Sequence, residues 1–347
     1  MERNSTTILS SIPMTTLTPN DDSKDTEHFA LISIRYIVGL LGIFANVFVL
    51  LMFVWAKLYK KSFTHLLLLH QSAIDVIASC LFLVYYTNDA PVGTPGTVFC
   101  KTRSIFWLFA FASTYNLVIV TIERYIAVVH PTTYRERIHG KTNCRFLILP
   151  HIVGLAIAAH LAVIGQTNNE GKCVFEYYIS SLASGLFIFI ISWLIPSAIM
   201  VFCYTYILRG LSQRVKRSGG AESSPGRGGN ALYAAQRSLT YTLLFVAIAF
   251  LLCWTPNYIL YLSYTICKCF EFNSSIAHEI TVILDAVNLM INPVIYAFKF
   301  NDFKITVKKF YKTYSGKCCD EDEEKKRAET VTGTSASITG NTSLSSN

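Results

Sequence analysis

Charged side chains are scarce in this sequence. Asp, Glu, Lys and Arg make up 15% of its 347 residues, whereas hydrophobic residues make up 52%. In an ordinary soluble domain about a quarter of the residues are charged, so this composition is typical of a membrane protein instead. A removable signal peptide is also lacking, because the polar opening MERNSTTILS precedes no apolar core with a small-residue cleavage site. We therefore expect the first membrane span to target the chain by itself.

Seven apolar runs are long enough to cross a membrane. A membrane-spanning helix needs about 20 apolar residues, because the hydrocarbon core is about 30 Å thick. The expected spans cover residues 29–55, 65–86, 105–129, 146–165, 177–208, 239–266 and 276–298. No internal repeat is detectable. The sequence therefore predicts an all-α integral membrane protein with a seven-transmembrane helix bundle and a short amphipathic eighth helix.

Lysine and arginine concentrate in alternate loops between these spans, a pattern that marks the cytoplasmic side. The basic side carries Lys57, Lys60, Lys61, Arg135, Arg137, Lys141, Arg145, Arg209, Arg214, Lys216, Arg217, Lys299, Lys304, Lys308, Lys309 and Lys312. The opposite side has Lys101, Arg103, Lys172 and Lys268. We therefore expect a multi-pass plasma-membrane protein with its amino terminus outside and its carboxyl terminus in the cytoplasm. The net charge of +8 then indicates attraction to anionic membrane lipid, and we expect no nucleic-acid partner.

The chain divides into a membrane domain and three flanking regions. Residues 1–28 are rich in Ser, Thr and Asp, which predicts a disordered extracellular tail. The membrane domain covers residues 29–300 and includes a Gly/Ser-rich, flexible cytoplasmic loop at 210–234. Residues 301–315 place apolar side chains at helical spacing between lysines, which predicts an interfacial helix. Residues 316–347 are expected to form a disordered cytoplasmic tail, in which Cys318 and Cys319 are candidate lipidation sites.

Two of the ten cysteines fall in segments expected outside the cell. Cys100 precedes the third span and Cys173 lies between the fourth and fifth, where oxidation is permitted, so we predict a disulfide between them rather than two free thiols. Cys267 and Cys269 also lie outside, and their pairing stays open because one intervening residue strains a mutual bond. Asn4 and Asn273 begin Asn-x-Ser/Thr triplets on the same side, which makes them candidate glycosylation sites.

Proline and buried polar residues recur along the spans in a fixed order. Pro293 frees the carbonyl of Leu289, which needs another donor inside a membrane, and Pro196 and Pro256 do the same in two other spans. The motifs in order are Asn46, Asp75, Glu123-Arg124-Tyr125, Pro196 with Tyr204, Phe250 with Cys253-Trp254-Thr255-Pro256, and Asn292-Pro293 with Tyr296. With these motifs on seven spans, the chain resembles the rhodopsin-like (class A) family of G-protein-coupled receptors over roughly residues 30 to 315.

The resemblance implies a receptor that activates a heterotrimeric G protein and that is not an enzyme. It also implies that Glu123 restrains Arg124 at rest, and that Arg124 turns toward the G protein and Tyr204 on activation. The residues expected in this switch are Glu123, Arg124, Tyr125, Tyr204, Thr240, Asn292, Pro293 and Tyr296. Gln236 stands where many relatives carry an acid that pairs with this arginine, so we expect that second restraint to be absent. Receptor kinases and arrestin are the expected partners of the Ser/Thr-rich tail.

Polar residues in the middle of the spans predict an ion site. Asp75 is an acid at membrane depth, where such a group marks an ion or proton path or is protonated. Asn288 and Asn292 share one helix face, and Ser113 lies at comparable depth. These residues resemble the family's sodium pocket, so sodium is the expected allosteric ion and no other cofactor is expected. The alternative is a protonated Asp75 that is hydrogen-bonded to its neighbours.

The sequence restricts the ligand without naming it. Phe106 stands where amine receptors carry an aspartate, and Ala286 occupies the region where opsins carry a lysine, so neither ligand class fits. The predicted pocket is formed by Phe106, Trp107, Trp254, Tyr258, Tyr261 and Asp285. We expect Asp285 to pair with a cationic group of the ligand. A neuropeptide is the leading candidate, and a lipid or small metabolite is the alternative.

Three features depart from the family's usual pattern. Cys100 lies one residue nearer Arg124 than expected, which predicts a shifted outer turn of the third span. The fourth span lacks a tryptophan, and Pro150 and His151 interrupt its middle, so its packing is left open. An intramembrane aspartyl protease would use two acids such as Asp75 and Asp285, but the second lacks a Gly-x-Gly-Asp motif. A transporter would show repeated halves, which are not seen.

Overall fold

The computed structural model describes residues 21–138, 145–177, 180–218, 227–268, 270, 272 and 275–315. For residues 21–28, 137, 214–218 and 227–236 only the backbone is described. Asn4, Asn273, Cys269, Cys318, Cys319 and the Ser/Thr-rich tail lie outside the described residues. The predictions made for them therefore stay predictions.

Seven segments of the described residues are long and apolar enough to cross a membrane, and they match the seven predicted spans. In chain order they are α1 (Asp21–Trp55), α2 (Phe63–Tyr86), α3 and α4 (Thr94–Thr102, Ser104–Val129), α6 (Arg145–Ile164), α7, η2 and α8 (Ser181–Phe189, Ile190–Leu194, Ile195–Ser218), α9 (Arg227–Cys267) and α10 (Ile276–Lys299). The short elements are η1 (Leu58–Lys60), α5 (Pro131–Arg137), β1 (Gly165–Thr167), β2 (Cys173–Phe175) and α11 (Asn301–Ser315).

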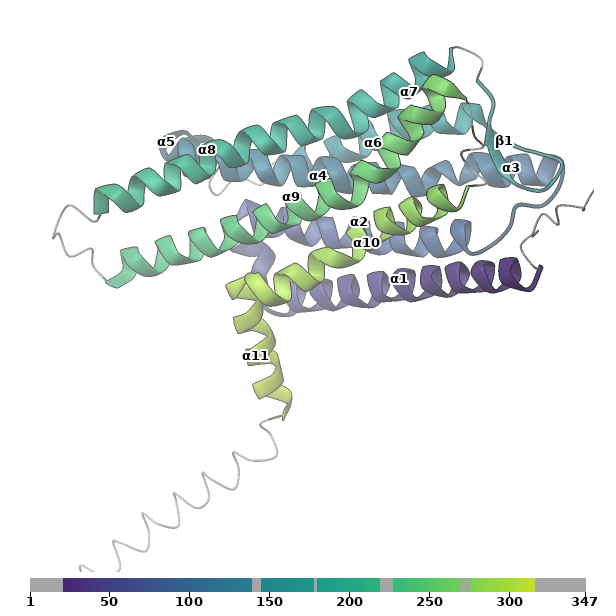
Figure 1. Ribbon diagram of the computed structural model, residues 1–347. Coiled ribbons are helices and arrows are strands. Elements are labelled where there is room, and N and C mark those ends of the chain that lie inside the picture. Colours follow the sequence, from purple (N-terminus) through teal and green to yellow (C-terminus); the bar gives the residue numbers. More distant parts are fainter. Residues whose placement is uncertain are drawn as a thin grey trace, which may run out of the picture.

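The bundle has two distinct ends (Figure 1). One end carries the antiparallel pair β1–β2, in which Gln166 faces Val174, and we call it the hairpin end. The opposite end carries α5, η1 and α11, and α11 turns sharply away from the axis of α10. We call it the α11 end. A disulfide joins Cys100 of α3 to Cys173 of β2 at the hairpin end, with 5.4 Å between their Cα atoms, which confirms the predicted bond.

Large apolar side chains cover the outside of the bundle. Phe44 of α1 is 67% exposed and Leu252 of α9 is 70% exposed, and each lies among other exposed apolar residues on its helix. A soluble monomer rarely exposes such continuous apolar surface. Within the bundle, by contrast, Trp254, Tyr296 and Phe82 are fully buried. The distribution is that of a multi-pass membrane protein with lipid around it.

Three helices are longer than the sequence predicted. α1 begins at Asp21 rather than at residue 29, because the acidic residues Asp21, Asp22 and Asp25 stand in its first turns, where they favour a helix. α8 continues to Ser218 and α9 begins at Arg227, so helix occupies much of the loop predicted at 210–234. The residues between them, 219–226, are outside the described part of the chain.

The third span is broken near its start, in the region where the position of Cys100 predicts a shifted outer turn. α3 ends at Thr102 and α4 begins at Ser104. Across the break the Phe106 amide donates a hydrogen bond to the Arg103 carbonyl at 3.1 Å. The two residues are three apart in the chain, as in a 3₁₀ turn, whereas an α-helix joins residues four apart. The tighter turn rotates the outer segment relative to α4 and places Arg103 at the junction.

Backbone carbonyl groups near Pro196 and Pro293 accept hydrogen bonds from side chains of neighbouring helices. The Leu289 carbonyl that Pro293 leaves unpaired accepts a hydrogen bond from Asn46 Nδ2 at 2.9 Å. Before Pro196, the chain forms the short π-helix η2, and the Ile191 carbonyl there accepts from the Tyr115 hydroxyl at 2.6 Å. Such bonds satisfy backbone groups that lipid cannot reach. They explain how α8 and α10 tolerate proline inside the membrane.

A pair of histidines connects the fourth span to its neighbours. His151 follows Pro150 in α6, and its Nε2 lies 3.1 Å from Nε2 of His70 in α2. Asn116 of α4 donates through Nδ2 to Leu67 and Gln71, so its Oδ1 accepts from His70 Nδ1 at 2.9 Å. His70 therefore carries its proton on Nδ1, and His151 donates to the open His70 Nε2. This contact joins α6 to α2.

Candidate functional site

The first polar site lies at the α11 end of α4 and contains the predicted switch residues Glu123 and Arg124. Arg124 donates through Nε and Nη2 to the two carboxylate oxygens of Glu123, each at 2.6 Å. Both side chains are buried, Glu123 to 3% exposure and Arg124 to 6%. A buried ion pair is stable only if its remaining hydrogen-bonding groups are also satisfied.

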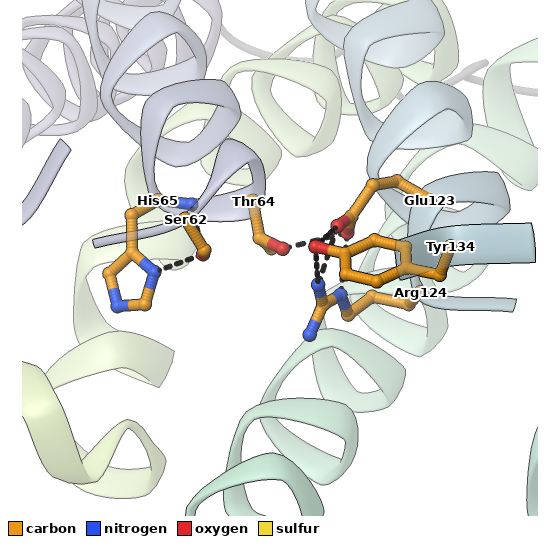
Figure 2. Close-up of polar contacts among 6 residues, drawn as sticks. All are labelled: Ser62, Thr64, His65, Glu123, Arg124 and Tyr134. Carbon is orange, nitrogen blue, oxygen red and sulfur yellow. Dashed lines mark hydrogen bonds and ion pairs between the residues drawn. The ribbon is translucent and has the colours of Figure 1, made fainter. Parts of the chain in front are cut away.

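Two further side chains complete this site, and the sequence did not identify either (Figure 2). Thr64 of α2 donates to Glu123 Oε2 at 2.7 Å, and Tyr134 of α5 donates to Glu123 Oε1 at 2.8 Å. Burial, together with the negative charge of Glu123, raises the pKa of Tyr134 to about 12, so its hydroxyl keeps its proton and donates. Glu123 thus receives donors from α2, α4 and α5, and α5 is fixed to α4 through it.

The other predicted switch residues lie close by but do not all join the pair. Tyr204 is buried on α8, and no hydrogen bond connects it to Arg124. Thr240 is buried on α9, and its hydroxyl has no hydrogen-bond partner among the described residues. Tyr125 packs instead against His130 and Phe202, with ring centroids 5.5 and 6.0 Å away. The Gln236 side chain is outside the described residues, so its predicted effect stays a prediction.

A cluster of basic and acidic groups attaches α11 beside this site. Asp302 of α11 accepts from His65 Nε2 of α2 and from Lys61 Nζ, each at 3.1 Å. The hydrogen bond from His65, assisted by Lys61, lowers the pKa of Asp302 to about 2 against the opposing effect of partial burial. In Figure 2, Thr64 points toward Glu123 while His65 points away from it. Adjacent residues of α2 therefore serve the switch and α11 separately.

A second polar site surrounds Asp75 in the middle of α2. Ser113 donates to Asp75 Oδ1 at 2.7 Å, and Asn292 donates to Asp75 Oδ2 at 3.0 Å. Gln71, which the sequence analysis did not single out, donates through Nε2 to both Asp75 oxygens, at 3.1 and 3.3 Å, and to the Ser113 hydroxyl. Asn288 faces Trp254 and accepts from its indole nitrogen at 3.2 Å. Three of the four predicted residues are thus joined directly, with the Gln71 amide between them.

Two cavities open toward the hairpin end. The aromatic cavity, of about 50 Å³, is lined by Tyr86, Arg103, Trp107, Phe111, Leu161, Phe175, Ile188, Asn257, Tyr258, Tyr261, Phe272 and His278. The polar cavity, of about 310 Å³, is lined by Ile32, Arg35, Tyr85, Tyr86, Thr87, Asn88, Asp89, Ala90, Phe99, Arg103, Gly171, Lys172, Cys173, His278, Glu279 and Val282. Tyr86, Arg103 and His278 belong to both linings.

The structure divides the six predicted pocket residues into two groups. Trp107, Tyr258 and Tyr261 line the aromatic cavity. Phe106, Trp254 and Asp285 are buried and absent from both linings. Asp285 instead accepts a hydrogen bond from Asn257, which does line the cavity. Phe106 is also one layer behind the lining, because its ring packs against Tyr86 and Trp107, with ring centroids 5.2 and 5.1 Å away.

With this geometry established, the chain can be compared with known proteins. The profile of the family described as "7 transmembrane receptor (rhodopsin family)" matches residues 45–296. The match covers all seven spans apart from the first half of α1, and it includes both polar sites. A seven-helix membrane bundle with these sites is the architecture of a receptor. The chain therefore belongs to the rhodopsin family of seven-transmembrane receptors and is a G-protein-coupled receptor.

Individual relatives are distant and differ in ligand. The chain is 27% identical over 333 residues to the platelet-activating factor receptor of Homo sapiens, covering 87% of this chain and 92% of that protein. It is 26% identical over 285 residues to the allatostatin-A receptor of Bombyx mori, covering 78% of this chain and 76% of that protein. A gonadotropin-releasing hormone II receptor of Clarias gariepinus is 27% identical over 224 residues, covering 60% of this chain and 58% of that protein.

Proposed function

We propose that an extracellular ligand enters at the hairpin end and shifts the bundle toward a state that admits a G protein at the α11 end. The observation that carries the proposal is the buried Glu123–Arg124 pair, which Thr64 and Tyr134 enclose at the end opposite to the cavities. Relatives with such different ligands do not settle the ligand class. A neuropeptide and a lipid or small metabolite both remain candidates.

The proposed switch is an exchange of partners by Arg124. At rest both carboxylate oxygens of Glu123 accept hydrogen bonds from one edge of the guanidinium group, Nε and Nη2. Activation moves the α11 half of α9 outward at the Pro256 kink, and Arg124 leaves Glu123 for Tyr204 and the G protein. A ligand drives this change only by binding one state more tightly than the other.

One aromatic side chain, Trp254, connects the aromatic cavity to the middle of the bundle. The Trp254 ring packs against Trp107 at 6.1 Å and against Tyr258 at 5.8 Å, both of which line the aromatic cavity. Its indole nitrogen donates to Asn288 on α10. Trp254 also lies two residues before Pro256, so a ligand that shifts these rings acts on the kink of α9 directly.

The proposed role of Asp75 is to bind sodium in the resting state. Sodium then opposes the active state, and the linkage is reciprocal. In this structure the Gln71 amide contacts the same oxygens of Asp75 and Ser113 that a sodium ion would use. Sodium therefore has to displace this amide. The alternative, a protonated Asp75 bound to its neighbours, needs no such movement.

The membrane orientation completes the proposal. The hairpin end, with its disulfide, faces the extracellular space, and α11 lies at the cytoplasmic face on anionic lipid. Lipid on Cys318 and Cys319, glycans on Asn4 and Asn273, and kinase and arrestin binding to the tail belong to the same proposal. An intramembrane protease is disfavoured because Asp75 and Asp285 bind separate groups of side chains, with Asn257 as the partner of Asp285.

The test is guanine-nucleotide exchange by the purified receptor in lipid nanodiscs with a panel of heterotrimeric G proteins. We expect ligand-free exchange on at least one of them, and we expect Arg124→Ala to abolish it. The matched control is Arg135→Ala, which removes an exposed arginine at the same end of the bundle. Exchange that survives Arg124→Ala at equal receptor amounts would remove Arg124 from the switch.

A further inference from the structure

The junction between the two cavities contains a cation that no described acid neutralises. Arg103 lines both cavities and is the one charged residue in the described lining of the aromatic cavity. Its guanidinium group lies 5.2 Å from the centre of the Tyr86 ring, a cation–π contact that leaves the N–H donors unused. Among the described residues it forms no ion pair.

The other cations near the polar cavity are already paired. Arg35 lies 3.4 Å from the Glu279 carboxylate and donates to the Tyr86 carbonyl at 2.9 Å. Lys172 lies 3.2 Å from Glu170. The remaining described acid of the polar cavity, Asp89, is exposed and forms no ion pair within the described residues. Arg103 is therefore the cation whose charge is directed to the cavities rather than to a protein carboxylate.

A second, independent feature, the side chain of His278, indicates a ligand group at the same junction of the two cavities. His278 of α10 also lines both cavities and is 7% exposed, yet its Nδ1 has no hydrogen-bond partner among the described residues. A buried polar atom without a partner is costly, so such an atom beside a cavity marks the place of a ligand group. An imidazole nitrogen can donate to an anion, as a guanidinium group does.

We propose that the ligand presents an anionic group, a carboxylate or a phosphate, to Arg103 and His278 at the junction of the two cavities. The anion sits beside an apolar group that enters the narrow aromatic cavity, while the remainder of the ligand leaves through the wider polar cavity. This assignment rests on the proposed function and names its ligand chemistry. It replaces the expectation of a cationic ligand on Asp285, because Asp285 is buried behind Asn257 whereas Arg103 is at the surface of the cavity.

Two classes of ligand combine an anionic group with an adjacent apolar group. A peptide with a free carboxyl terminus would place its last side chain in the aromatic cavity and its carboxylate on Arg103. An acidic lipid would place its chain in the same cavity and its head group on Arg103. The aromatic lining of this cavity suits an apolar side chain or an aliphatic chain.

The experiment uses matched acidic and neutral probes on the purified receptor in nanodiscs, with G-protein nucleotide exchange as the readout. One arm compares lysophosphatidate with monoacylglycerol and oleate with its methyl ester. The other compares pools of decapeptides that end in Leu, Ile, Val or Phe, as free acids and as amides. We expect the acidic member of at least one arm to be at least about tenfold more potent than its neutral partner.

Receptor variants test whether the preference for acidic over neutral probes depends on Arg103. Arg103→Gln is expected to reduce the acid preference to less than about twofold, and Arg103→Lys is expected to keep part of it because the charge remains. Lys268→Gln is the matched control, since it removes an exposed cation that lines neither cavity. Surface labelling confirms equal amounts of each folded receptor.

The outcomes separate this proposal from the proposed function. Neutral probes as potent as acids, an acid preference unchanged in Arg103→Gln, or no response to any acid would each overturn the anion site. A receptor that still drives ligand-free exchange through Arg124 would in that case keep its proposed function. Absence of exchange under every condition would instead overturn the proposed function. Which arm responds identifies peptide or lipid as the source.

Discussion

At the scale of single residues, the state of the switch is determined by the donors to one carboxylate. Glu123 accepts hydrogen bonds from Thr64, Arg124 and Tyr134, which belong to three different helices. Each bond to a charged group contributes about 1.5–3 kcal/mol, so no single donor is negligible beside the few kcal/mol that separate two receptor states. We therefore expect the proposed resting state to depend on α2 and α5 as well as on the Glu123–Arg124 pair itself.

Tyr134→Phe tests this directly. The substitution removes a donor to Glu123 and weakens the restraint on Arg124, so ligand-free nucleotide exchange should rise severalfold or more, the equivalent of about 1.5 kcal/mol. Exchange is measured at matched receptor amounts. Tyr314→Phe, at an exposed tyrosine of α11, is the control and should leave exchange unchanged. If both variants behave like the intact receptor, Tyr134 does not stabilise the resting state.

We expect Gln71 to control the proposed sodium response at Asp75. Because its amide contacts the oxygens that sodium would use, Gln71→Leu should make sodium a stronger inhibitor of ligand-free exchange at constant ionic strength. Asp75→Asn should abolish the sodium effect, and choline should not replace sodium. A Gln71→Leu receptor that ignores sodium would show that Asp75 is a buried hydrogen-bonded acid and no ion site.

At the scale of elements, hydrogen-bonded side chains fix the helices that sequence left uncertain. The fourth span has no tryptophan, and its packing could not be predicted because His151 meets its partner, His70, 81 residues away in the chain. From His70 the bonds continue through Asn116 and Gln71 to Asp75. α6 is thus linked to the middle of the bundle by a continuous series of hydrogen bonds.

A double-mutant cycle measures this link. His70→Phe, His151→Phe and the double variant should show a coupling free energy of about 0.6 to 1.7 kcal/mol, the range seen for side-chain hydrogen bonds between membrane helices. Thermal unfolding of the detergent-solubilised receptor supplies the stabilities. Strictly additive effects would mean that the two imidazoles do not interact and that α6 packs by shape alone.

The attachment of α11 has a defined pH dependence. The pKa of Asp302 is lowered to about 2, so its contribution to stability is complete above the ordinary carboxyl pKa of about 3.9 and is lost as pH falls toward 2. Between pH 5 and pH 8 the Asp302 carboxylate should therefore not change. Hydrogen exchange of the α11 amides at pH 7 should accelerate in Asp302→Asn and stay the same in Asp89→Asn. Equal exchange in both would show that packing of Phe303 and Phe310, not charge, attaches α11.

At the scale of the whole molecule, the sequence predicted the seven-helix architecture and some of the residues of each polar site. Apolar run length predicted seven spans, and the extracellular placement of two cysteines predicted the Cys100–Cys173 bond. Local motifs pointed to Glu123 with Arg124, and to Asp75 with Ser113, Asn288 and Asn292. Tyr134, Gln71 and His278 could not be predicted, because their partners lie on other helices and no local pattern marks them. Asp285 was placed in the pocket by its helical spacing, and the packing of α9 against α10 buries it instead.

The cavities are lined by residues of the hairpin end, and the Glu123–Arg124 pair lies at the α11 end. Figure 1 shows these as opposite ends of one bundle, so any signal must travel along the helices between them. Trp254 and the kink at Pro256 lie on the shortest such route, in α9. α9 packs extensively against α10 but touches α4 and α8 little, which leaves its α11 half able to swing outward.

The distance between α5 and α9 at the α11 end tests this account most directly. Spin labels at Thr132→Cys and Arg237→Cys, in a receptor whose reactive cysteines are replaced, report that distance by pulsed electron resonance. We predict that an agonist together with nucleotide-free G protein lengthens it by several ångströms, and that Arg124→Ala prevents the G protein from stabilising the longer distance. An unchanged distance in a receptor that still drives nucleotide exchange would contradict the account.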